Sequence, residues 1–197
     1  MYAALHASAR YAPRIVSLIW LTIVVFYLGN AFRTQRTVRR QSTSSRWLQA
    51  GLCILGFVFL FSSVAHTGIF GWRILPRSLV IINLGLLLTL AGCALAIWAR
   101  LVLGRNWSAS VTVKQDHILT TRGPYAFVRH PIYSGLLLAA LGAAIVHGAV
   151  ADLLALCLIF AGFWIKSHTE ESFMLQEFGQ QYTAYKQRVK ALVPGLL

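Results

Sequence analysis

The chain has 197 residues, of which 57% are hydrophobic and 12% are charged, and its formal net charge is +13. Soluble domains carry roughly 25% charged residues, so the composition excludes an ordinary soluble globular protein. Apolar segments occupy most of the length and leave no room for a separate soluble domain. We therefore expect one membrane domain over residues 1–197.

The positive charge first suggests nucleic acid as a partner, but its placement argues against this. Arginine and lysine gather in alternate connections between the apolar segments. On one side lie Arg33, Arg36, Arg39, Arg40, Arg46, Arg105, Lys114, Arg122, Arg129, Lys166, Lys186, Arg188 and Lys190. On the other side lie only Arg10, Arg14, Arg73 and Arg77. Because cytoplasmic loops are enriched in these residues, we expect no nucleic acid partner. We expect a multi-pass protein of a bacterial inner membrane with its C-terminus in the cytoplasm.

Five apolar stretches approach the ~20 residues that a spanning helix needs. They are Ile15–Phe32, Trp47–His66, Ser78–Trp98, Tyr133–Val150 and Ala151–Ile165. The first has the length of a signal-peptide core, but the basic "RTQRTVRR" that follows would then have to be translocated, which favours a retained helix. The fifth either stops at Lys166 or continues into the segment that follows. The pattern predicts an all-α integral membrane protein.

Small residues recur at four-residue spacing in the third and fourth spans. The third span carries Gly85, Thr89 and Cys93 with Gly92 and Ala96 beside them, and the fourth carries Gly135, Ala139 and Ala143. Such residues let helix backbones approach closely in lipid. His147, Gly148 and Asp152 mark a short reversal, so we expect the fourth and fifth spans to form an antiparallel hairpin.

The three cysteines form no motif. Cys53, Cys93 and Cys157 fall in different spans and show no CxxC spacing. Buried free cysteine behaves as a small hydrophobic residue. We assign no disulfide, redox role or metal ligand from the sequence.

The segment after the fifth span has helical periodicity. An apolar face is formed by Met174, Phe178, Tyr182, Tyr185 and Val189, which predicts a C-terminal amphipathic helix. "SHTE" at 167–170 fits a capping box, although the fifth helix could also continue through it. Neither reading explains why Glu170 and Glu171 lie so close to the membrane in a chain with five acidic residues.

The connection Gly104–Pro131 is longer than the 2–8 residues usual between packed helices, and we expect it to fold onto the membrane surface or into the bundle. It and the residues that follow it offer His117, Arg122, Tyr125, Arg129, His130 and Tyr133. Pro131 suits the first position of a helix, and the amides there, with Arg129 and His130, would form an anion-binding corner. The residues alone predict a polar, charged cofactor at the cytoplasmic membrane surface and leave its identity open.

Two motifs then point to a family. "HILTTRGPYAFVRHPIYSG", followed by "EESFMLQEFGQQYTAYKQRV" and a terminal proline, resembles the isoprenylcysteine carboxyl methyltransferases and, more broadly, the membrane methyltransferases that include phospholipid methyltransferases. The resemblance covers roughly residues 108–194. The apolar pattern predicts three transmembrane helices within residues 1–103, which match the family only in being apolar. The resemblance implies that residues 104–197 form the catalytic half, with a cytoplasmic cofactor-binding loop.

The resemblance implies S-adenosyl-L-methionine as the cofactor, taken from the cytoplasm, and a lipophilic methyl acceptor taken from the bilayer lipids. The cofactor contacts carried over are His117, Ile118, Leu119, Thr120, Tyr125, His130, Pro131, Ile132, Tyr133 and Glu171. Arg129 belongs to the family's RHP triplet and would face the cofactor or the acceptor. Where carboxyl methyltransferases of the family place an arginine about one turn before the cofactor-binding glutamate, this chain has Lys166-Ser167-His168.

The acceptor chemistry follows from these residues as a hypothesis. An isoprenylcysteine-like carboxylate is already ionised and needs only a cation to hold it, for which Arg129 and Lys166 are the candidates. An amine acceptor, as in phospholipid or small-amine N-methyltransferases, needs a base, for which His130 or Glu170 would serve.

Two other readings use the same residues differently. Sterol reductases have a similar C-terminal half and use NADPH. A channel or adaptor is disfavoured because the ionisable residues cluster in one loop and one tail rather than within the spans.

Overall fold

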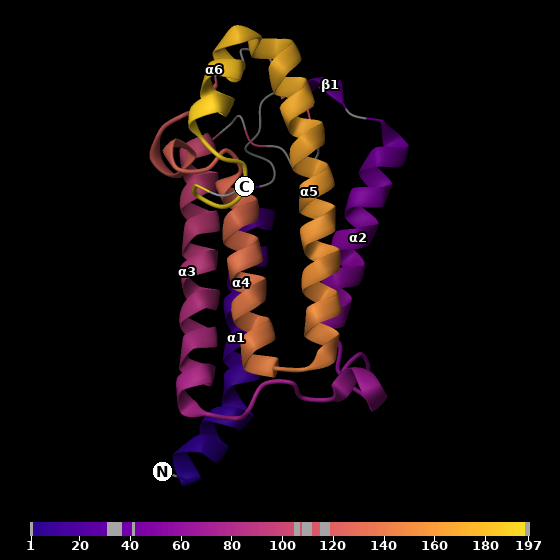
Figure 1. Ribbon diagram of the computed structural model, residues 1–197, viewed down its shortest axis with the longest axis vertical. Coiled ribbons are helices and arrows are strands. Elements are labelled where there is room, and N and C mark those ends of the chain that lie inside the picture. Colours follow the sequence, from indigo (N-terminus) through magenta and orange to yellow (C-terminus); the bar gives the residue numbers. More distant parts are fainter. Residues whose placement is uncertain are drawn as a thin grey trace.

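The computed structural model describes residues 2–30, 37–40, 42–104, 107, 112–114 and 119–195. Most of these residues are helical (Figure 1). The helices are α1 (Tyr2–Asn30), α2 (Thr43–Phe61), α3 (Leu79–Leu103), α4 (Pro131–His147), α5 (Val150–Phe178) and α6 (Gln180–Arg188), with the 3₁₀ turns η1 (Gly68–Gly71) and η3 (Gly123–Ala126).

The chain is a multi-pass membrane protein. Four helical segments are long and apolar enough to cross a bilayer, namely residues 7–30 of α1 together with α2, α3 and α5. The helix α4 is equally apolar but has 17 residues, about 26 Å at 1.5 Å per residue, slightly less than the ~30 Å hydrocarbon core. The fifth crossing therefore stays a prediction for α4.

Glycines bring the helices together in two pairs. The predicted small-residue stripes of α3 and α4 face each other: a Cβ built on Gly92 would lie 2.3 Å from the backbone nitrogen of Ala139, and one on Gly142 would lie 2.4 Å from that of Thr89. Between α2 and α5, a Cβ on Gly56 would lie 2.6 Å from Ile159 Cγ1. Close backbone approach, as the spacing predicted, holds α3 against α4. The helix α5 follows α4 after a reversal at Gly148 (φ 68°) but packs mainly against α2.

Replacing Gly92 with alanine is expected to lower the stability of the protein by about 1–3 kcal/mol, because the added methyl group must push α3 and α4 apart. Thermal unfolding in detergent measures this loss. Gly51 on α2 is the matched control, since a Cβ there meets nothing within 4 Å. Equal melting temperatures for Gly92→Ala and Gly51→Ala would show that the close approach carries no stability.

The two ends of the bundle differ in construction. At one end, η1 and the α4–α5 turn lie together; at the other, α6 and the residues after it lie over the ends of α3 and α4 (Figure 1). The second end also contains η3, where the hydroxyl of buried Tyr125 donates to the carbonyl of Ala99 on α3 (3.4 Å). The described part of the connection between α3 and α4 therefore folds against the helix bundle, which was one of the two arrangements expected from the sequence.

Two details differ from the predicted all-α fold. A short antiparallel ladder pairs β1 (Thr37–Arg40) with β2 (Thr112–Lys114) and joins the first and third connections. The capping-box reading at Ser167 is wrong, because α5 runs unbroken to Phe178 and stops only at Gly179, whose φ of 49° favours glycine. The predicted amphipathic helix is thus divided between the end of α5 and α6, with Tyr182 and Tyr185 buried.

Candidate active site

The two motifs meet at the α6 end of the bundle. The ring of His130 lies between two carboxylates, with Nδ1 3.3 Å from Glu170 Oε2 and Nε2 3.3 Å from Glu171 Oε1. The hydroxyl of Tyr133 donates to Glu170 Oε1 at 2.5 Å. The predicted proximity of the RHPxY run and the paired glutamates is confirmed.

The backbone before α4 fixes this arrangement. The N–H groups of Arg129 and His130 donate to the carbonyls of Lys190 and Ala191 (2.8 and 3.0 Å). Pro131 then begins α4 at the position where a missing N–H removes no hydrogen bond. The hydroxyl of Ser134 donates to the carbonyl of Leu192 (2.6 Å). The segment after α6 therefore holds the start of α4 in place.

Glu171 lies in a nearly closed environment of positive charge. Its side chain is 6% exposed, and Arg129 donates to Oε1 from both Nε (2.8 Å) and Nη2 (2.5 Å). Lys186 on α6 lies 2.7 Å from Oε2. Arg129 also donates to the carbonyls of Lys186 and Val189. The Arg129–Glu171 pair therefore ties the loop, α5 and α6 together.

An aromatic column continues from the ion cluster into the bundle. The rings of His130 and Tyr133 stack with centroids 5.6 Å apart, and those of Tyr133 and Phe163 with centroids 4.9 Å apart. The ammonium of Lys166 lies 5.3 Å from the centroid of Tyr133, within the range of a cation–π contact. The face of Tyr133 can therefore accept a cation.

Opposing effects set the pKa of His130. Burial lowers it, but hydrogen bonds and Coulombic attraction from Glu170 and Glu171 outweigh burial, and the pKa is raised above the usual ~6.5. Since the folded pKa exceeds the unfolded one, protonated His130 stabilises the fold. This contribution is complete below about pH 6.5 and is lost as the pH rises through the raised value.

We therefore expect the melting temperature of the wild type to fall as pH rises from about 6 to 9, and to fall less in His130→Gln. Thermal unfolding at a series of pH values measures both slopes. His168→Gln, at an exposed position on α5, should keep the wild-type slope. Equal slopes in wild type and His130→Gln would contradict the protonation of His130.

The other predicted site residues are placed less centrally. Leu119 and Thr120 are half-buried, while Pro131 and Ile132 are buried in the first turn of α4. Tyr125 is buried, and its own backbone carbonyl accepts a hydrogen bond from the hydroxyl of Tyr185 (2.6 Å). His117 and Ile118 lie outside the described residues.

The two side chains of the predicted anion-binding corner already contact carboxylates of the protein. Those of Arg129 and His130 face Glu170 and Glu171, and the backbone N–H groups of the same two residues are bonded to carbonyls. The part of the corner that the amides in the first turn of α4 would form stays a prediction.

Sequence reasoning missed Lys186, which it counted only as part of the cytoplasmic positive charge. Its contact with Glu171 follows from its place on α6, because it lies four residues after buried Tyr182 and one turn of helix brings the two to the same side. The apolar periodicity of this segment was the available signal.

Comparisons with known proteins match the chain to methyltransferases. A family model described as phospholipid methyltransferase matches residues 80–181, which is just over half of the chain. Protein-S-isoprenylcysteine O-methyltransferase of Schizosaccharomyces pombe is 35% identical over 94 residues, covering 46% of this chain and 40% of that protein. Protein-S-isoprenylcysteine O-methyltransferase B of Arabidopsis thaliana is 32% identical over 115 residues, covering 57% and 58%.

A solved structure shares the fold. The eukaryotic intramembrane Ras methyltransferase ICMT (isoprenylcysteine carboxyl methyltransferase) matches 81% of this chain and 55% of its own, with a TM-score of 0.51 and 27% identity. The chain spans about half the length of the curated relatives it matches. The matched range contains both α4 and the glutamate pair, so the chain belongs to the family of membrane methyltransferases that the phospholipid methyltransferase model describes and that includes the isoprenylcysteine carboxyl methyltransferases.

Proposed function

We propose that this protein transfers a methyl group from S-adenosylmethionine to a lipophilic acceptor, and that the acceptor is the carboxylate of an isoprenylcysteine-like compound. The observation that carries the proposal is the convergence of Glu170 and Glu171 with His130 and Tyr133 at the end of the bundle. Relatives that match about half of the chain are protein-S-isoprenylcysteine O-methyltransferases.

The donor set suits the chemistry of S-adenosylmethionine, which supplies a methyl group on a positively charged sulfur. Carboxylates at Glu170 and Glu171 accept hydrogen bonds from an ammonium group or from ribose hydroxyls. The ring of Tyr133, which already contacts the ammonium of Lys166 at 5.3 Å, shows that this part of the site tolerates a cation beside an aromatic face. We assign the donor site to these residues together with the loop contacts Leu119, Thr120, Tyr125, His130, Pro131 and Ile132, and to His117 and Ile118 beyond the described residues.

The acceptor carboxylate needs a cation to hold it. The guanidinium of Arg129 is bonded to Glu171 and to two backbone carbonyls, so we assign it the role of positioning Glu171. Lys166, four residues before Glu170 on α5, lies closest in the chain to the place where the family's arginine stands, and we assign it to hold the acceptor. A carboxylate requires no base, because it is already ionised at neutral pH.

An apolar cavity gives the acceptor's hydrocarbon chain a place within the membrane. It has a volume of about 520 Å³ and is lined by Trp20, Val24 and Tyr27 of α1, Phe57 of α2 and Leu136 of α4, among others. Leu136 lies one turn after Tyr133, so the cavity and the ion cluster share the start of α4. A prenyl chain in this cavity would leave its polar end near the cytoplasmic surface.

The test uses detergent-purified protein with methyl-labelled S-adenosylmethionine and S-farnesyl-N-acetylcysteine. We expect label in a base-labile methyl ester, and thermal stabilisation by S-adenosylmethionine but not by NADPH. Stabilisation by NADPH alone would overturn the methyltransferase assignment. Absence of ester from a protein that binds the donor would overturn the carboxylate acceptor.

A second acceptor class is favoured by the description of the matching family model, phospholipid methyltransferase. An amine headgroup must lose a proton before it attacks, and Glu170, which is 23% exposed and bonded to both His130 and Tyr133, is the base within reach. The same assay with phosphatidylethanolamine distinguishes the two classes, since an N-methyl product keeps its label in base.

A further inference from the structure

A second cluster of ionisable side chains lies at the other end of the bundle. His66 from the loop after α2, His147 at the end of α4 and Asp152 in the first turn of α5 meet there. Asp152 Oδ1 lies 3.2 Å from His66 Nε2 and 3.2 Å from His147 Nδ1, and the Asp152 side chain is 2% exposed. This end, with η1 and the α4–α5 turn, is opposite to α6 (Figure 1), and the methyl-transfer proposal does not use these residues.

Hydrogen bonds to the backbone orient the side chains of His66 and Asp152 toward each other. His66 Nδ1 lies 2.9 Å from the carbonyl of Ser62. A carbonyl only accepts, so Nδ1 carries the proton and Nε2 faces Asp152. Asp152 Oδ2 accepts the N–H of Ala149 at 2.7 Å, which leaves Oδ1 directed at the histidines. Metal ligands are oriented in this way, with a backbone partner on the atom that does not bind the metal.

The distances fit a tetrahedral ion. With metal–ligand bonds of about 2.0–2.1 Å, the edges of the tetrahedron are about 3.3 Å, and the two separations from Asp152 Oδ1 are 3.2 Å. A charge-assisted N–H···O bond is normally shorter, about 2.7–2.9 Å. The third edge, between His66 and His147, is at most 4.8 Å, so a small rotation of either ring closes the set.

We propose that His66, His147 and Asp152 bind one divalent zinc-class cation. Two imidazoles and one carboxylate are the donors that suit zinc, and three protein ligands leave a fourth position open. The ligand segments are already held together, because the N–H of Ile74 donates to the carbonyl of Gly148 (2.8 Å) and the N–H of Val150 donates to that of Trp72 (2.9 Å). The ion would therefore bind with little reorganisation of the backbone.

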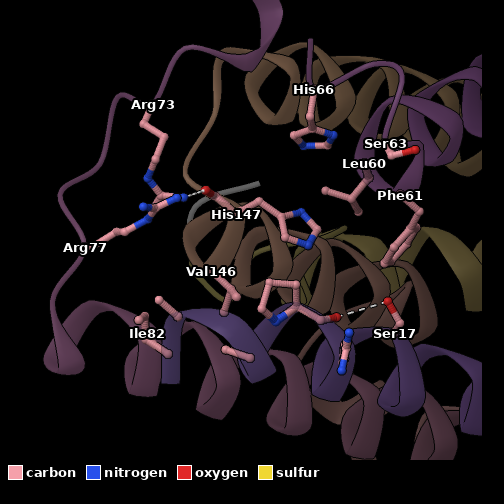
Figure 2. Close-up of a pocket in the computed structure, with 14 residues that line it drawn as sticks. Ser17, Leu60, Phe61, Ser63, His66, Arg73, Arg77, Ile82, Val146 and His147 are labelled. Carbon is pink, nitrogen blue, oxygen red and sulfur yellow. Dashed lines mark hydrogen bonds between the residues drawn. The ribbon is translucent and has the colours of Figure 1, made fainter. Parts of the chain in front are cut away.

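Two of the three proposed ligands line a pocket. His66 and His147 lie in the wall of a cavity of about 360 Å³, which Arg73 and Arg77 also line, and Figure 2 shows the two rings near each other there. The ring centroids are 5.4 Å apart. Positive charge from these arginines lowers the affinity for a bare dication and favours an anion as the fourth ligand. We therefore assign the fourth position to hydroxide or another small anion.

The test titrates Co²⁺, and then competing Zn²⁺, into protein purified in detergent with any histidine tag removed. We expect one Co²⁺ per chain with the strong visible absorption of a tetrahedral site, lost when Zn²⁺ is added. His66→Gln and His147→Gln should each weaken binding at least about tenfold, because even changes around a metal ligand cost ~10–100-fold. His168→Gln, an exposed histidine on α5, is the matched control and should bind as the wild type does.

The outcomes are decisive without any measurement of methyl transfer, so failure here is distinct from failure of the proposed function. Absence of a tetrahedral Co²⁺ spectrum in the wild type would overturn the site, even if the glutamine variants do not fold. If the variants melt at lower temperatures than the wild type, and metal changes the melting temperature of neither the wild type nor the variants, the cluster contributes only hydrogen bonds to stability. If the variants misfold, X-ray absorption of zinc bound to the wild type decides. Two imidazole ligands on the zinc would support the site, and the absence of imidazole ligands would overturn it.

Discussion

Glutamine in place of Glu171 is expected to weaken binding of S-adenosylmethionine by about 10- to 100-fold, the equivalent of the ~1.5–3 kcal/mol that a hydrogen bond to a charged group contributes. Glutamine keeps the shape of the side chain but not its negative charge. The negative charge balances Arg129 and Lys186 in the folded protein. In the proposed complex it also attracts the N–H or O–H groups of S-adenosylmethionine. Calorimetric titration of the donor into detergent-solubilised protein measures the change.

Glu177→Gln is the control for this variant, because Glu177 lies on the same helix at an exposed position and should leave the affinity unchanged. Titrations must be made below the melting temperature of each variant, so that loss of binding is not loss of fold. A folded Glu171→Gln protein with wild-type affinity would remove Glu171 from the donor site.

Removing the side chain of Arg129 is expected to destabilise the protein by about 3–5 kcal/mol, the cost of leaving one member of a buried ion pair without its partner. The Arg129 side chain is 8% exposed, and it bonds to Glu171 and to the carbonyls of Lys186 and Val189. Arg129→Lys should recover only part of the loss, since a single ammonium cannot form the fork of bonds that a guanidinium makes. Thermal or denaturant unfolding in detergent gives the difference.

Arg122→Ala serves as the comparison, because Arg122 lies in the same connection but is exposed, and its loss should change stability by no more than about 0.5 kcal/mol. The double variant Arg129→Ala with Glu171→Gln should lose less than the sum of the single changes, because each single change already breaks the shared contact. Additive losses would show that the two side chains do not interact in solution.

The sequence predicted the parts of this molecule that depend on short-range patterns. The four-residue spacing at Gly135 and Ala139 predicted close helix contact, and the glycines of α3 and α4 lie in that contact. The two sequence motifs predicted that the RHPxY run lies beside Glu170 and Glu171. In the structure, His130 and Tyr133 lie within hydrogen-bonding distance of Glu170. These features are local or belong to motifs that recur together.

Other features depend on how distant segments meet, which periodicity does not encode. The carbonyls of Lys190 and Ala191 take the N–H groups before α4, and Glu170 and Glu171 contact the side chains of the anion-binding corner expected there. The helix α5 continues through Ser167, which is buried there, although the residue type alone also favours a helix cap. Likewise, His66 and Asp152 are separated by 86 residues, and only the packing of α2 against α5 brings them together.

The division of the bundle into two helix pairs has a consequence for the order of binding. Glycine contacts join α3 to α4 and α2 to α5, whereas the glutamates of α5 reach His130 and Tyr133 across the boundary between the pairs. A hydrocarbon chain that enters from the lipid between the pairs would stretch those few polar contacts before it disturbed either glycine contact. A water-soluble ligand already bound to both sides of the boundary would resist that stretching, so the two substrates of the proposed reaction would influence each other's entry even though they approach from different phases.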